Sequence, residues 1–279
     1  PDSKGGGMDQ AETFLGFPAE GLAPGARGLV VCGIAADAGP AALRRASQRL
    51  RSDDPYPWGV DAFAGCTVRD VGDCQAVDAA LADDAIDAYA GALLAAGNRL
   101  VTLGGAVGVT PALLAAHARA HGRPLNLIAF GAHPALYDHA RAAGSIDPDR
   151  SIRVSVRTGV AGGRETLSAV WLQEHGPAAT LARIRERAGD GPVYVSFNLD
   201  GLDPAYAPGT GAPVVGGPST ALALSWVRGL GMLDLVGADV MGLLPDRDVG
   251  GITALAGAQF ARELCGLIAL RLSDRAHVP

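Results

Sequence analysis

Residues 196–217 read SFNLDGLDPAYAPGTGAPVVGG, and no other stretch of the chain is as specific. The apolar run PVYVSFNLD at 192–200 leads into this stretch and predicts a β-strand. Because side chains two positions apart in a strand point to the same face, Asn198 and Asp200 are expected to lie side by side. The Asp-Pro and Pro-Gly pairs that follow predict a tight loop directly beyond the end of this strand.

Outward from this stretch, short apolar runs alternate with longer amphipathic segments in both directions along the chain. Runs that are apolar on both faces are typical of strands in a parallel sheet covered on both sides. The predicted strands cover residues 28–35, 67–73, 99–105, 125–131, 151–157, 192–200 and 233–241. The predicted helices cover residues 40–50, 75–96, 110–121, 176–188, 220–230 and 252–272. This alternation predicts an α/β fold in three layers, α/β/α, around a central, mostly parallel sheet of about eight strands.

Length and composition indicate one large domain with an extensive core. The chain has 279 residues, of which 48% are hydrophobic and 19% charged. Residues 8–279 are expected to form this domain, and residues 1–7, PDSKGGG, are interpreted as a remnant added ahead of Met8. The formal net charge of −6 argues against a nucleic-acid partner or an anionic membrane surface.

Two further features favour a cytoplasmic protein. We find no apolar run of roughly 18 residues that would span a membrane, and no leader peptide. None of the four cysteines lies in a CxxC pattern, so reduced thiols are expected rather than disulfides or a zinc site. These cysteines are Cys32, Cys66, Cys74 and Cys265.

Stretch 196–217 resembles the signature SFDxDxxDPxxxPGTGxPxxGG of the ureohydrolase family, which includes arginase, agmatinase and formimidoylglutamase. It departs from that signature at Asn198. The family motifs GGDHS and DAHxD correspond to GGAVG at 104–108 and GAHPA at 131–135. Further family blocks match GIAADAGP at 33–40, DVGD at 70–73 and LVGADVMGLLPDRD at 235–248. The resemblance covers most of the chain and implies an arginase-like fold.

The resemblance also implies where a metal site would lie. Family members hold two manganese ions bridged by hydroxide, using two histidines and four aspartates. The corresponding positions here are Val107, Gly131, His133, Ala135, Asn198 and Asp200. Only His133 and Asp200 keep a family ligand, and Gly242 stands where the family has an acid that contacts the guanidinium.

These substitutions lead to the expectation of a non-catalytic homologue without a metal cofactor. Valine, glycine and alanine side chains offer no lone pairs, and asparagine offers only a neutral carbonyl in place of an anionic bridging oxygen. Such a protein is expected to act as a homo-oligomer, trimeric or hexameric, or as a hetero-oligomer with an active relative. A small guanidino or amino-acid-like molecule is its expected ligand.

Two enzymatic hypotheses stand beside this expectation. The first is a divergent amidinohydrolase that cleaves a C–N bond of a guanidino or formimino compound through another ligand set, such as His133, Asp138, His139 and Asp200. The second is a metal-free enzyme that uses the same pocket, with His133 as its acid or base.

Several residues near the strand ends have both a functional and a structural interpretation. The candidates for ligand contact are Arg157, Asp138, His139, Asp203 and Gly242. Arg157 suits bidentate recognition of a carboxylate but equally suits an ion pair within the protein. Asp200 and Asp203 suit structural turns tied to backbone amides, and His133 suits a cap at the end of its strand.

Overall fold

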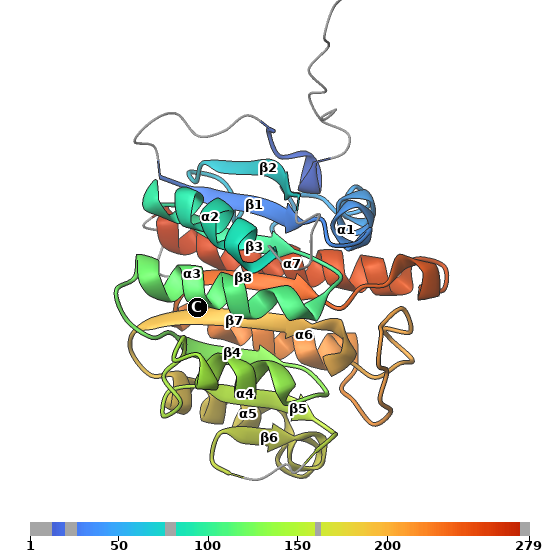
Figure 1. Ribbon diagram of the computed structural model, residues 1–279. Helices are drawn as coiled ribbons and strands as arrows, with labels where there is room; N and C mark the ends of the chain where they lie inside the picture. Colours follow the sequence, from blue (N-terminus) through green and yellow to red (C-terminus); the bar gives the residue numbers. More distant parts are fainter. Residues whose placement is uncertain (1–12, 20–26, 76–81, 160–162, 274–279) are drawn as a thin grey trace, which may run out of the picture.

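Eight strands form one sheet in the order β2-β1-β3-β8-β7-β4-β5-β6 (Figure 1). Every neighbouring pair in this sheet runs parallel. The strands are β1 (Leu29–Ile34), β2 (Val68–Cys74), β3 (Arg99–Leu103), β4 (Asn126–Phe130), β5 (Ile152–Val156), β6 (Thr166–Ser168), β7 (Pro192–Asn198) and β8 (Asp234–Met241). The predicted parallel sheet of about eight strands is confirmed, with the runs at 99–105 and 192–200 in the same sheet.

The coordinates are those of a computed structural model, which describes residues 13–19, 27–75, 82–159 and 163–273. The proposed remnant at residues 1–7 lies outside these ranges. So does part of the predicted helix at 75–96, of which the structure describes Ala82–Ala95.

Helices cover both faces of the sheet. They are α1 (Gly39–Ser47), α2 (Ala82–Ala95), α3 (Thr110–Ala120), α4 (Ala135–Ala142), α5 (Ala169–Ala188), α6 (Thr220–Arg228) and α7 (Ile252–Leu272). In Figure 1, α2, α3 and α4 lie on the near face of the sheet, and α5, α6 and α7 lie behind it. α1 packs against α7 and belongs to that second layer. The arrangement confirms the predicted α/β/α layers.

Two short elements and one helix boundary differ from the sequence prediction. The strand β6 has three residues and α4 has eight, both too short for hydrophobic periodicity to reveal them. Helix α5 begins at Ala169 instead of residue 176, because the Ser168 hydroxyl caps it by accepting from the Trp171 amide at 3.2 Å. Gly176, with φ 75°, interrupts this helix just before Pro177, and that interruption explains the misplaced start.

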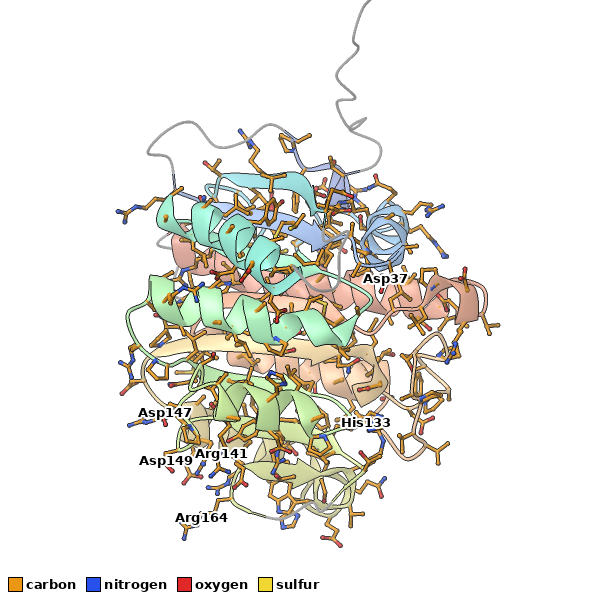
Figure 2. The ribbon with its side chains drawn as sticks, viewed as in Figure 1. Asp37, His133, Arg141, Asp147, Asp149 and Arg164 are labelled. Carbon is orange, nitrogen blue, oxygen red and sulfur yellow. The ribbon has the colours of Figure 1, made fainter. Side chains whose placement is uncertain are left out.

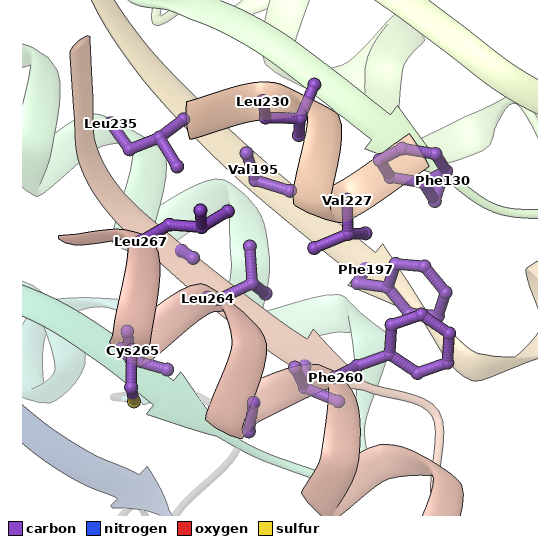
Figure 3. Packing of buried hydrophobic residues seen from close by; sticks show 14 of the residues in the cluster. Phe130, Val195, Phe197, Val227, Leu230, Leu235, Phe260, Leu264, Cys265 and Leu267 are labelled. Carbon is purple, nitrogen blue, oxygen red and sulfur yellow. The ribbon is translucent and has the colours of Figure 1, made fainter. Parts of the chain in front are cut away.

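An aromatic stack lies directly beneath the carboxyl ends of β4 and β7 (Figure 3). Phe130 ends β4 and Phe197 stands one residue before the end of β7, with ring centroids 5.2 Å apart. Phe260 of α7 stacks on Phe197 at 3.9 Å. All three rings are buried. Gly131 and Asn198, which follow Phe130 and Phe197, therefore begin the site from well-packed positions at the strand ends.

The last helix corrects one expectation about membrane spans. Within the described residues, α7 is long and apolar enough to cross a membrane by length and composition. However, 78% of its most apolar window is buried inside the protein. The helix is therefore the central helix of the α1–α5–α6–α7 layer, packed against β1, β3 and β8.

A carboxyl group is buried in the middle of the sheet. Asp239 of β8 is fully buried, and it accepts hydrogen bonds from the Ser196 hydroxyl at 2.7 Å and the Tyr194 hydroxyl at 3.0 Å. Burial raises the pKa of Asp239 to about 6, against an ordinary value of 3.8, although these hydrogen bonds oppose the rise. Between pH 3.8 and about 6, Asp239 is therefore protonated in the folded state and ionised in the unfolded state.

We predict that Asp239→Asn removes part of the pH dependence of stability. With the pKa raised on folding, the stabilising contribution is complete below the unfolded value and is lost as the pH rises through about 6. The loss amounts to roughly 3 kcal/mol at most, by the usual 1.36 kcal/mol per pKa unit. Urea unfolding at pH 4.5 and pH 7.5 should show Asp239→Asn gaining stability relative to the native chain at the higher pH. Exposed Asp246→Asn is the control, and an equal difference at both pH values would contradict the prediction.

Candidate active site

Four neighbouring strands bring the sequence motifs to one edge of the sheet. The strands β3, β8, β7 and β4 are adjacent, so their carboxyl ends lie side by side, where parallel α/β folds bind ligands. The Gly242 amide, just after β8, donates to the Gly105 carbonyl after β3 at 2.9 Å. A Cβ on Gly131, after β4, would lie 3.4 Å from Asp200 Oδ1 and 3.6 Å from the Asn198 Cβ. The motifs that the sequence separates thus meet in space.

Asp200 is the buried acid of this edge. It lies in a 3-10 turn at Leu199–Gly201 that directly continues β7. Its Oδ1 accepts from the Ala132 amide at 3.0 Å, and its Oδ2 accepts from the Asn198 side-chain amide at 3.0 Å. Burial is the largest cause of a raised pKa at Asp200, with the Ala132 amide opposing it. Asn198 and Asp200 do lie side by side, as the strand spacing predicts.

His133 faces Asp200 from the segment that follows the neighbouring strand, β4. Its Nε2 lies 3.9 Å from Asp200 Oδ2, and 35% of its side chain is exposed. Nε2 also lies 3.0 Å from the Ala212 carbonyl, and Nδ1 lies 2.9 Å from the Thr158 hydroxyl. That hydroxyl is within donating distance of the Ala132 carbonyl at 3.2 Å. The ring is thus held by defined partners near the carboxyl ends of the strands, and Figure 2 shows its place in the fold.

Arg157 holds the backbone around Asp200. Its Nη2 donates to the Asp200 carbonyl at 2.6 Å and the Leu202 carbonyl at 3.1 Å, and its Nη1 donates to the Gly201 carbonyl at 2.9 Å. Its Nε donates to the Val214 carbonyl at 3.2 Å. Because backbone carbonyls already take up these donors, we interpret Arg157 as a positioning residue and not as a contact for a substrate carboxylate.

Asp203 closes the loop beyond β7. Its carboxylate accepts from the amides of Ala205 at 3.0 Å, Gly216 at 2.7 Å and Gly217 at 3.2 Å. These hydrogen bonds lower the pKa of Asp203, and the one from the Ala205 amide has the largest effect. A Cβ on Gly217 would lie 2.6 Å from the Asp203 amide nitrogen, so only glycine allows this closure. Asp203 therefore joins the two ends of the 203–217 loop.

The remaining predicted site residues make no hydrogen bond or ion pair with His133 or Asp200 among the described residues. Val107 is exposed in a 3-10 turn after β3, and Ala135 is exposed at the start of α4. The Asp138 carboxylate pairs with Arg153 at 3.2 Å, and His139 is exposed on α4. No contact described here joins Asp138 or His139 to Asp200.

Sequence reasoning missed two polar residues at this edge. Thr158 orients the His133 ring, and the only signal for it is its place directly after Arg157. Asp37 accepts from the Gly39 amide at 2.8 Å. Its Oδ1 lies so close to Gly105 that a Cβ there would clash, so Asp37 packs on the GGAVG motif. The acid in the run GIAADAGP is the sequence signal for this second residue.

The described residues do not fit the two-manganese centre that the family resemblance implies. No group of three or more His, Cys, Asp or Glu side chains placed to hold a metal occurs among them. Both Asp200 oxygens already accept hydrogen bonds, and His133 Nε2 lies against a carbonyl. A Cβ on Gly242 would lie 2.2 Å from the Asn198 amide oxygen, which fills the space beside it.

We predict that Arg157→Lys loosens the loop beyond β7. A lysine ammonium has three donors without the planar fork, so buried carbonyls of residues 200–202 lose partners, at a cost of roughly 1–3 kcal/mol. Hydrogen–deuterium exchange should become faster across residues 199–217. Arg247→Lys is the matched control, because Arg247 contacts the same loop through one exposed hydrogen bond to the Gly211 carbonyl. Equal exchange in the two variants would contradict the positioning role.

We also predict that Gly131→Asp combined with Asn198→Asp creates a cation site beside Asp200. The side chain at 131 has room, since its Cβ would make ordinary contacts, and three carboxylates would then crowd together. Like charges lower stability without metal, and manganese bound only to the folded state reverses this loss. Thermal melting with and without manganese measures both effects. The exposed pair Ala92→Asp and Ala142→Asp controls for added charge, and a melting temperature insensitive to millimolar manganese would refute the site geometry.

Comparison with known proteins extends the family resemblance. A sequence model of the Arginase family matches residues 29–266. The chain is 42% identical to an agmatinase of Chromobacterium violaceum over 82% of this chain and 77% of that protein. A crystal structure of a hypothetical agmatinase from Burkholderia thailandensis has a TM-score of 0.87 and 39% identity, covering 94% of this chain and 91% of that one. Proclavaminate amidino hydrolase from Streptomyces clavuligerus has a TM-score of 0.84 and 30% identity, covering 95% and 98%.

These findings correct two expectations from the sequence. A non-catalytic homologue is contradicted by relatives named agmatinase at about 40% identity over most of the chain, which point to a hydrolase. The expected absence of a cofactor is contradicted as well, since the family normally uses manganese and the same relatives suggest a metal. The described side chains nevertheless form no such site. The family match over residues 29–266 and the identity to agmatinases show that this chain belongs to the Arginase family.

Proposed function

We propose that the chain is a divergent amidinohydrolase that cleaves a C–N bond of a guanidino compound. The relatives named agmatinase and the amidino hydrolase structure support this reaction class. In the reaction, an alkylguanidinium and water give urea and a protonated alkylamine, so atoms and charge balance. A formimino compound offers the same amidine carbon and is the second substrate class to test.

The observation that carries the proposal is the placement of His133 and Asp200 just beyond the ends of the adjacent strands β4 and β7, with Nε2 3.9 Å from Oδ2. The Asp200 carboxylate, 8% exposed, attracts a planar cation by charge-assisted hydrogen bonds. His133 supplies a nitrogen that accepts a proton from water as the C–O bond forms. The same nitrogen returns the proton to the leaving amine as the C–N bond breaks. One side chain thus serves as base and then as acid.

The loop at 203–217 covers this pair. The Ala212 carbonyl contacts His133 Nε2, so a substrate or water must displace it before the nitrogen can take a proton. Arg157 and Asp203 hold the two ends of the loop, which favours movement of its middle around Ala212. Substrate entry would therefore separate the Ala212 carbonyl from His133 Nε2 in the same movement.

The assembly and setting of the protein follow from the family. Ureohydrolases are typically oligomeric, in agreement with the expected homo-oligomer. We propose a trimer or hexamer, with residues 8–279 as one domain, and a cytoplasmic enzyme. A hetero-oligomer with a relative is the second possibility. Light scattering of the full chain at micromolar concentration distinguishes these states from a monomer.

We predict that the protein releases urea from agmatine, or from a guanidino compound with a longer or shorter alkyl chain. This activity should depend on His133. Removing a positioned acid–base group should lower the rate about 10²–10⁴-fold in His133→Asn. His139→Asn is the matched control, since His139 is exposed six residues away on α4 and should leave the rate unchanged. Assays run with added manganese and after chelation test the family's cofactor separately. Urea release that is absent under every condition, or equal in His133→Asn, would overturn the proposal.

A further inference from the structure

A hollow of about 320 Å³ lies at the opposite end of the strands from His133. Charged side chains line it, namely Asp149, Arg150, Arg164, Arg183, Glu186 and Arg187. They come from the turn before β5, the segment before β6 and the last turns of α5. Figure 2 shows Asp149 and Arg164 at the end of the molecule opposite His133. The hollow is therefore separate from the candidate active site.

The hollow carries an excess of positive charge. Four guanidiniums face two carboxylates there, in a chain with a formal net charge of −6. Arg183 pairs with Glu186 at 2.8 Å, while among the described residues Arg150 and Arg164 have no carboxylate within ion-pair distance. The negative end of the α5 macrodipole accounts for arginines in its last turn. It does not account for Arg150 and Arg164, which come from other segments.

Several of these side chains are held in place. Arg187 donates from Nε to the Ser151 carbonyl at 3.1 Å and from Nη2 to the Pro148 carbonyl at 2.6 Å, which leaves Nη1 free of these contacts. The Arg150 guanidinium lies over Gly189, where a Cβ would be 2.2 Å from Nη1. A glycine with φ 52° at the end of α5 thus leaves room for this arginine.

From this placement we propose that the hollow binds a small, multiply charged oxyanion of the phosphate class. Guanidiniums recognise phosphate oxygens bidentately, and groups from three segments suit a tetrahedral anion better than a planar carboxylate. Asp149 and Glu186 compete for the same arginines, so a singly charged anion binds weakly. A bound phosphate links α5 to the segments before β5 and β6 and relieves repulsion among the arginines. This proposal is independent of the proposed hydrolysis.

The test measures binding of inorganic phosphate and pyrophosphate to the full chain by titration calorimetry, at constant ionic strength set with sodium chloride. Pyrophosphate should bind at least tenfold more tightly than phosphate and raise the melting temperature as it saturates the folded state. Arg150→Ala combined with Arg164→Ala should weaken pyrophosphate binding at least tenfold. The double variant loses no side-chain hydrogen bond of the described structure, so its melting temperature without anion should be close to that of the native chain.

Two further variants keep the result unambiguous. Exposed Arg141→Ala removes a nearby arginine outside the hollow and should leave binding unchanged. Glu186→Gln frees Arg183 from its partner and should tighten pyrophosphate binding. Binding that survives in the Arg150–Arg164 double variant, or that chloride alone reproduces, would overturn the proposal. Citrate binding as tight as pyrophosphate would overturn the phosphate class.

Discussion

The candidate site depends on how one half-buried guanidinium, that of Arg157, hydrogen-bonds to the backbone just beyond the end of β7. Residues 200–202 turn away from the strand, so their carbonyls have no neighbouring strand to accept from. Arg157, from the end of β5, donates to all three of them and to Val214 across the loop. Unpaired buried carbonyls would otherwise cost roughly 1–3 kcal/mol each. The position of the Asp200 carboxylate therefore follows from a residue that is two strands away in the sheet.

Below this turn, aromatic rings line the sheet side of the site, and above it lies the loop at 203–217. Beneath the strand ends, Phe260 stacks on Phe197, and Phe130 packs against Phe197 at a tilt; the backbone after Phe130 and Phe197 carries His133 and Asp200. A stacked floor resists movement toward the sheet, so any rearrangement at the site must occur in the loop. The 3.9 Å gap between His133 Nε2 and Asp200 Oδ2 is thus set by rigid elements.

The sequence predicted the layers, the parallel sheet and most strands, because each long element carries its own periodicity. β6 and α4 were missed since three and eight residues hold too few apolar positions to show a period. At the site, the pairing of Asn198 with Asp200 followed from strand geometry alone. The roles of Thr158 and Asp37 did not, because both depend on contacts with segments distant in the sequence. Arg157 was recognised as notable, yet its partners are backbone carbonyls that no side-chain pattern encodes.

Overall identity and the donor atoms of a site depend on different residues. The match to agmatinases is one of the whole chain, 42% identity to one relative and a TM-score of 0.87 to a solved structure, and it reflects the shared fold. The acid–base chemistry rests on the few side chains that line this edge. Here the neutral amide of Asn198 donates to Asp200, whereas a carboxylate at position 198 would repel it. The hydrogen bond from Asn198 therefore stabilises the buried Asp200 carboxylate beside His133 without adding a second negative charge. That local arrangement is why the proposed hydrolysis is assigned to Asp200 and His133.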